Sequence, residues 1–231
     1  MAEQSETTSE TSSRLSYARV EETASETGLI VMGALHPRVT QAKHPEGGTL
    51  VLLGAGDAFW PALKASPEWL DQHPDPVDRW SSRVIGDMAS DLGAQAHFPF
   101  GGPPYAPFID WALKSGRTFS SPVGALVHDT VGMMISFRGA LHFPSEFDVP
   151  EASAPSPCIT CDAPCTSTCP VGALNAESFY NVDACHRYLS TAAGQICMTG
   201  GCAVRLACPL SKGAGRRAEQ SSHHMRAFHP T

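Results

Sequence analysis

All eight cysteines of this 231-residue chain lie between Cys158 and Cys208. The residues that precede Cys158 contain none. Thiols gathered in one segment indicate a part of the chain whose fold depends on cysteine chemistry, through either metal ligation or disulfide formation. The sequence therefore predicts two parts placed end to end, a cysteine-free scaffold and a cysteine-dependent module. The proline-rich stretch 142–157, which has no hydrophobic periodicity, separates them.

The first cysteine run, CITCDAPCTSTCP, has the spacing C-x2-C-x3-C-x3-C-P. It is similar to the bacterial ferredoxin run C-x2-C-x2-C-x3-C-P, in which three thiolates bind one [4Fe–4S] cluster and the fourth binds the other. The departure is one additional residue in the middle gap, which a loop can absorb. The remaining cysteines are more widely spaced and also end in Cys-Pro. The ferredoxin resemblance implies crossed ligand sets, with cluster 1 held by Cys158, Cys161, Cys165 and Cys208, and cluster 2 held by Cys169, Cys185, Cys197 and Cys202.

The spacing leaves three other interpretations open. A structural zinc site also takes four thiolates, but its ligands usually arrive as two separated C-x2-C pairs, and this chain has one such pair. A disulfide framework would need an oxidising compartment. The third is a module that no longer holds one of its clusters, because the second cysteine set does not have the standard ferredoxin spacing.

The charge and hydropathy of the chain limit its partners and its location. A net charge of −7 argues against nucleic-acid binding through a basic face, because phosphate binding requires clustered lysine and arginine. The apolar runs are too short to cross a bilayer, and the N-terminus has neither the basic nor the apolar region of a signal peptide. We therefore expect a cytoplasmic protein with no membrane contact, whose partner is another redox protein.

Hydrophobic patterning in the cysteine-free part predicts a layered domain. Short apolar runs bounded by glycine or proline predict buried strands, and a 3.6-residue apolar period predicts helices. Strands are expected at 29–35, 49–56, 94–100, 123–129 and 132–143, and helices at 14–27, 76–94 and 106–116. We expect the last two strands to pair through a tight turn. The expected fold class is α+β, with an α/β layered N-terminal domain followed by a small bis-cluster ferredoxin-like module.

These changes in composition also predict the domain boundaries. Serine, threonine and glutamate dominate the N-terminal end, which is typical of disorder. The predicted organisation is a disordered tail at 1–13, an α/β domain at 14–145, a linker at 146–157, a ferredoxin-like 4Fe–4S module at 158–212 and a C-terminal tail at 213–231.

Three stretches around the cysteines, CITCDAPCTSTCPVGAL, NVDACHRYLS and GCAVRLACPLS, resemble those of a known family. They are similar to the iron–sulfur portion of epoxyqueuosine reductases and related corrinoid-dependent reductases, and a weaker likeness extends upstream to residue 14. In that family the second run has a further cysteine where this chain has Arg205, so the resemblance makes Cys197 the substitute ligand. The general-acid Asp of the family falls at Gly101 or Gly102, which counts against epoxyqueuosine reduction itself.

The resemblance also implies a corrinoid (cobalamin) or a flavin in the N-terminal domain, for which three residues are candidate contacts. Tyr105 lies between two prolines and can face a planar cofactor, His128 ends an apolar strand, and Arg138 can pair with an anion. Simple packing, a hydrogen-bonded histidine beside a turn-capping Asp129 and a solvated strand position are the alternative explanations.

Two functional hypotheses follow from the sequence. The first is a ferredoxin-like 4Fe–4S electron-transfer protein that exchanges electrons with a redox partner protein. The second is an oxidoreductase, a corrinoid- or flavin-dependent reductase in which the clusters feed electrons to a cofactor in the N-terminal domain.

Overall fold

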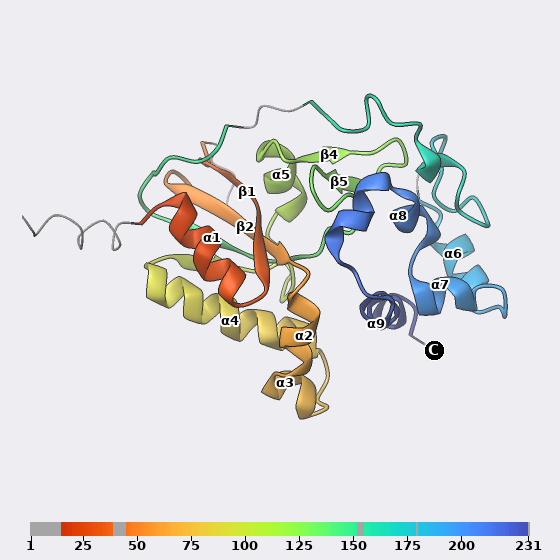
Figure 1. Ribbon diagram of the computed structural model, residues 1–231, viewed down its shortest axis with the longest axis horizontal. Helices are drawn as coiled ribbons and strands as arrows, with labels where there is room; N and C mark the ends of the chain where they lie inside the picture. The colour runs from red at the N-terminus through yellow and green to blue at the C-terminus, as the bar shows by residue number, and fades with distance from the viewer. Residues whose placement is uncertain (1–14, 39–44, 152–154, 179, 231) are drawn as a thin grey trace, which may run out of the picture.

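The computed structural model describes residues 15–38, 45–151, 155–178 and 180–230, so the tail predicted at 1–13 lies outside the described residues. It shows a mixed α+β fold with a small antiparallel sheet and several helices (Figure 1). The elements before the linker are α1 (Tyr17–Glu26), β1 (Leu29–Leu35), β2 (Thr49–Ala55), α2 (Phe59–Lys64), α3 (Pro67–Leu70), α4 (Pro76–Leu92), β3 (Gln95–His97), α5 (Phe108–Lys114), β4 (Thr118–Ser120), β5 (Leu126–His128) and β6 (Phe137–Phe143).

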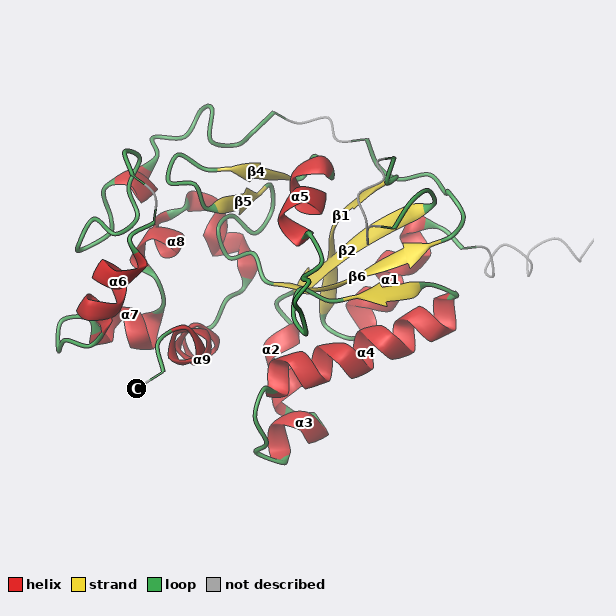
Figure 2. Cartoon of the chain, turned by 180° about the vertical axis from the view of Figure 1, so that it is seen from behind, coloured by secondary structure: helices red, strands yellow, loops and turns green. Residues whose placement is uncertain are grey.

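The main sheet has the strand order β1-β2-β6-β3, and every neighbouring pair is antiparallel. Both faces are covered, and Figure 2 shows α4 running along one of them. Because successive side chains of a strand point to opposite faces, β2 contributes to two cores. Val51 and Leu53 pack with α1 and α4, whereas Leu50 and Leu52 pack with α5. The sheet is therefore the middle layer of the N-terminal part.

Helix α4 confirms the prediction made from its apolar period. Pro76 occupies its first turn, where a missing backbone N–H costs nothing, and Gly93 ends it with a left-handed backbone (φ 69°). Trp80, Ile85 and Met88 on its inner face are buried. The helix is thus fixed at both ends by local sequence and along its length by the core.

The predicted hairpin of strands 123–129 and 132–143 is wrong. Strand β5 pairs with β4 in a separate two-stranded sheet, while β6 pairs with β2 and β3. The residues between β5 and β6 leave the strands and contact the cysteine-containing part instead. There the Met133 N–H donates to Ser211 Oγ at 3.1 Å, and Arg205 donates to the carbonyls of Met133 and Ile135 at 2.6 and 2.9 Å.

The part of the chain after the linker is built from short helices and turns. Its elements are η1 (Pro164–Thr166), α6 (Val182–Leu189), α7 (Gln195–Gly200), α8 (Ala203–Ala207), η2 (Pro209–Ala214) and α9 (Ala218–Phe228). No strand is found among its described residues, so the structure does not confirm a ferredoxin-like module. The predicted linker 146–157 has no helix or strand in the part that the structure describes.

The segment 213–231, expected as a C-terminal tail, contains helix α9. Glu219 of α9 accepts hydrogen bonds from Trp60 Nε1 at 3.1 Å and from Lys64 Nζ at 2.9 Å. The ring of His223 packs against those of Trp60 and Trp69, with centroids 5.5 and 5.3 Å apart. Helix α9 therefore joins α2 and α3 to the cysteine-containing part, where it packs on α7. Across the described ranges, the helices are all too short or too polar to cross a membrane.

Candidate functional site

All eight cysteines are described, all are free, and they form two groups in space. In the first group, Cys165 of η1 and Cys208 at the end of α8 are buried in one apolar cluster, against which Cys158 packs, as do Cys169 and Cys202 of the second group. Burial is the main cause that raises the pKa of the Cys165 thiol, and the negative charges of Cys158, Cys161 and Cys208 add to it. Similarly, burial and the charges of Cys161 and Cys208 raise the pKa of Cys158. These four thiols are therefore close neighbours, although Cys208 is distant in sequence.

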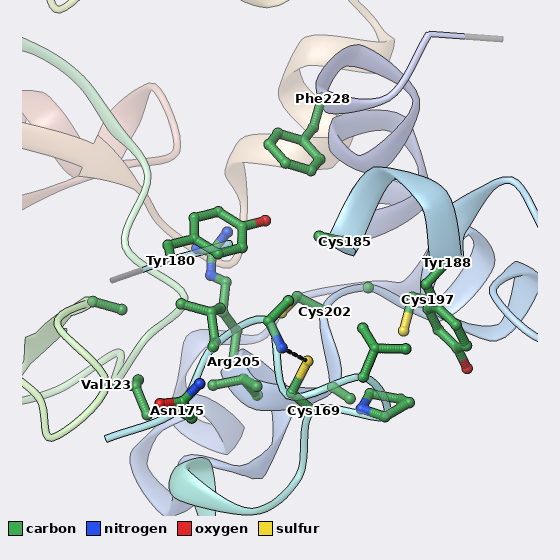
Figure 3. Close-up of a pocket in the computed structure, with 18 of the residues that line it drawn as sticks. Val123, Cys169, Asn175, Tyr180, Cys185, Tyr188, Cys197, Cys202, Arg205 and Phe228 are labelled. Atoms are coloured by element: carbon green, nitrogen blue, oxygen red, sulfur yellow. Dashed lines mark hydrogen bonds between the residues drawn. The ribbon is translucent and has the colours of Figure 1, made fainter. Parts of the chain in front are cut away.

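The second group lines a cavity of about 770 Å³ (Figure 3). Its members are Cys169 beside Pro170, Cys185 of α6, Cys197 of α7 and Cys202 at the start of α8. Burial raises the pKa of Cys197 first, and the charges of the other three cysteines raise it further. The same order of causes raises the pKa of Cys185, with Cys202 and Cys169 as the charged neighbours.

Backbone and side-chain donors are already directed at sulfur atoms of the second group. The Ala173 N–H donates to Cys169 Sγ at 3.2 Å, which is the dashed line in Figure 3. A backbone hydrogen bond from Ala203 lowers the pKa of Cys197, opposing the effect of burial, and a hydrogen bond from Tyr180 acts in the same way on Cys185. Such donors stabilise the thiolate, which is the form of cysteine that binds metal.

The charges that act on the buried thiols divide the cysteines in the same way as the two ligand sets implied by the ferredoxin resemblance, and these ligand sets stay a prediction. Among the described residues, no set of three or more His, Cys, Asp or Glu side chains converges on a site for one metal ion. A four-iron cluster makes a different demand, because each of its four cysteine ligands binds a separate iron. The donor set of four free thiols per group fits such a cluster, while ligation itself stays a prediction.

Arg205 stands where the resemblance to the reductases places a further cysteine, and in the structure it has another role. Its guanidinium group donates to the carbonyls of Met133 and Ile135, and burial lowers its pKa. The Cys202 thiolate has the opposite, smaller effect on that pKa, so the two charges are near each other. Arg205 thus fastens α8 to the N-terminal part and places a positive charge beside the second cysteine group.

The three candidate cofactor contacts of the N-terminal part are not brought together. The Tyr105 side chain is 64% exposed. His128 is fully buried, and burial lowers its pKa; its Nδ1 accepts from the Thr130 N–H at 3.1 Å, which leaves Nε2 to donate to the Met32 carbonyl at 3.0 Å. Arg138 pairs with Asp78 at 3.3 Å. None of the three lines the cavity at the second cysteine group or a further cavity of about 580 Å³ beside Trp111.

Two residues of the site were missed by sequence reasoning. Arg216, between η2 and α9, and His224 of α9 both line the cavity of the second cysteine group. The sequence places both in a segment expected to be an exposed tail. The polar residues Gln220, Ser221 and Ser222 form the buried face of α9, so no apolar period marks this helix.

Comparison of the chain with protein-family models and with curated proteins gives no match.

Proposed function

We propose that this chain is an iron–sulfur electron-transfer protein that binds two [4Fe–4S] clusters through its two cysteine groups. One observation carries the proposal. The charge neighbours of the buried thiols divide the eight free cysteines into two groups of four, and each group combines cysteines from both sequence runs. Cys169 and Cys208 each act on the group that lies farther from them in sequence. Exchange of the Cys-Pro ligand is the pattern of two-cluster ferredoxins.

Within this proposal each group would hold one cluster, and a bound [4Fe–4S] cluster supplies one-electron chemistry. The chain's own residues set the conditions. Burial opposes negative charge in both groups, because it is the largest cause that raises the pKa of Cys165 and of Cys197. Hydrogen bonds oppose this effect in both groups, from Ser156 on the pKa of Cys158 and from Ala203 on the pKa of Cys197. The charge of Arg205 lies beside Cys202 of the second group, whose cavity gives it access to the surface.

The partner in this proposal is another redox protein. The net charge of −7 suits attraction to a basic patch on that partner. A reduced protein or flavin would donate one electron at a time to this chain, and the partner protein would accept that electron from it. The oxidation state of this chain would therefore be the same before and after one cycle of transfer.

A reductase that uses a corrinoid or a flavin is the second candidate function. The cavity beside Cys169, Cys197 and Cys202 favours it, because about 770 Å³ lies within the usual range of small-molecule sites. The pocket is also rich in apolar side chains such as Val123, Leu174 and Phe228. In this case the acceptor would be a small molecule bound to the chain.

Anaerobic reduction of the purified protein tests the proposal and separates the two candidates. We expect the broad visible absorption of thiolate-bound iron to bleach on reduction and to return when an oxidised acceptor protein is added. Paramagnetic resonance of the reduced sample should show signals of reduced [4Fe–4S] clusters. Cobalamin or flavin is then added to a second sample, and a bound, spectrally shifted cofactor would favour the reductase. Absence of any reducible chromophore would overturn both candidates.

A further inference from the structure

Three arginines and one histidine gather beside the second cysteine group. Burial lowers the pKa of Arg216, and the positive charges of Arg205 and Arg138 lower it further. Burial likewise lowers the pKa of His224 to about 3, with the charges of Arg216, Arg138 and Arg205 among the additional causes. Residues that repel one another in this way lie close together, and His224 is uncharged at neutral pH. The fold has thus gathered three positive charges around one neutral histidine, and all four side chains are half-buried.

Several nitrogen atoms of these basic side chains have no hydrogen-bond partner. In the described part of the chain, Nε of Arg138, Nε of Arg216 and Nε2 of His224 are buried without a hydrogen bond. Such atoms are costly to bury, and a native structure normally pairs them with protein, water or a ligand.

The negative charges of the protein do not balance the positive charges of these basic side chains. Arg138 pairs with Asp78, and Arg205 is satisfied by two backbone carbonyls. Arg216 forms no ion pair within the described ranges, and no cysteine is among the charges that act on it or on His224. Cys202 is therefore the one cysteine whose charge acts on Arg205, and no charge of the second group compensates Arg216.

Arg216 and His224 also face accessible space, because both line the cavity of about 770 Å³. Figure 3 shows Arg205 and the apolar side chains of Val123 and Phe228 in the lining of the same cavity. Glu177 lines it as well, but this residue is exposed. One wall of the cavity is therefore cationic, and much of the remainder is apolar.

We propose that Arg216 and His224 bind a small oxyanion, the carboxylate or phosphate group of an acceptor molecule, in the cavity beside the second cysteine group. A guanidinium group presents paired donors that match the oxygens of either anion. The buried Nε2 atom of His224 supplies a further nitrogen for the same anion. That the molecule carrying the anion accepts electrons rests on the proposed function, whereas the anion site rests on the charges and the cavity alone.

Calorimetric titration of the full-length, anaerobically purified protein tests the site. The probes are sodium phosphate and sodium acetate, each titrated in a chloride buffer. We expect at least one of the two anions to bind. Binding of phosphate but not of acetate would identify a phosphate site, and binding of acetate but not of phosphate would identify a carboxylate site. Arg216→Gln should weaken binding by about tenfold to hundredfold, the usual effect of one charged hydrogen-bond partner. Arg217→Gln removes the same charge from the exposed neighbour and should leave affinity unchanged.

A thermal measurement keeps the test decisive if a variant folds poorly. Arg216→Gln removes a half-buried charge that has no ion-pair partner among the described residues. In chloride buffer the melting temperature of this variant should therefore equal or exceed that of the unaltered protein. Added anion should raise the melting temperature of the unaltered protein but not that of the variant. His224→Gln is the second variant and should also weaken binding. No binding of either probe would overturn the inference, as would equal weakening by Arg216→Gln and Arg217→Gln. Iron and sulfide are measured on the same sample, so Arg216-dependent binding without clusters would reject the proposed function alone.

Discussion

Replacing Gly132 by alanine tests whether the N-terminal part positions the first cysteine group. Gly132 has a left-handed backbone (φ +58°) in the turn after β5. A Cβ atom built on it would lie 2.5 Å from the backbone nitrogen of Ser211 and 2.8 Å from the carbonyl carbon of Leu210. Both atoms belong to η2, which begins directly after Cys208. Alanine at this position must therefore push η2, and with it Cys208, away from the turn.

The expected cost has two parts. A left-handed backbone costs a non-glycine residue about 1–2 kcal/mol. Overpacking against backbone atoms costs about 1–3 kcal/mol more, which gives about 2–5 kcal/mol in total. Gly93→Ala is the matched control, because Gly93 also has a left-handed backbone (φ +69°) but nothing lies within 4 Å of its added Cβ. At about 2–4 °C per kcal/mol, Gly132→Ala should melt about 2–12 °C below this control.

The assay is thermal unfolding followed by circular dichroism under anaerobic conditions, with iron content measured on both variants. Gly132→Ala should lose iron although all eight cysteines are intact, since Cys208 is displaced. Gly93→Ala should retain it. Equal melting temperatures and equal iron contents would refute the argument that this turn holds η2 in place.

Three further predictions concern the ligand sets, an ion pair and α9. Cys208→Ser should remove the cluster held by the first cysteine group, and Cys197→Ser should remove the cluster held by the second. Paramagnetic resonance of the reduced variants should show that each variant loses the signal that the other keeps. Identical spectra would contradict the grouping. The hydrogen bond with Arg83 is the main cause that lowers the pKa of Glu68 to about 2. At a pH above the unfolded-state pKa of about 4.3, this carboxylate therefore stabilises the fold. The stabilisation is lost as the pH falls towards about 2. The melting temperature of Glu68→Gln should therefore lie below that of the unaltered protein at neutral pH, and the difference should shrink on acidification; a constant difference would argue against it. Glu219→Gln weakens both hydrogen bonds of α9 to α2, so we expect faster hydrogen exchange of the backbone amides in α9. Unchanged exchange rates would mean that other contacts hold this helix.

The elements that the sequence predicts well are those fixed by local patterns. Strands β1 and β2 are continuous apolar runs, and α4 carries an apolar period between a proline and a glycine. The partners of β5 and β6 are not predicted in this way, because they are set by contacts between distant parts of the chain. Arg205 binds the residues between the two strands through the carbonyls of Met133 and Ile135, about 70 residues away in sequence.

The candidate site also contains residues that local sequence patterns predict and residues that they do not. Cysteine spacing is a local signal, and its resemblance to the ferredoxin run implies the two ligand sets, which stay a prediction. The positions of Arg216 and His224 depend on α9, whose buried face is polar and whose contacts with α2 and α3 are distant in sequence. The sequence marks Arg205 only through the resemblance, as a position where the reductases have a cysteine, because hydrogen bonds to backbone carbonyls do not follow a residue pattern.

Iron and acid-labile sulfide per chain, measured together with zinc on anaerobically purified protein, test the central claim most directly. Two [4Fe–4S] clusters predict about eight iron and eight sulfide per chain, with no stoichiometric zinc. About four of each would mean that one cysteine group holds no cluster, and the Cys208→Ser and Cys197→Ser variants would show which one. Stoichiometric zinc without sulfide would contradict the account, because zinc binds cysteine thiolates without inorganic sulfide.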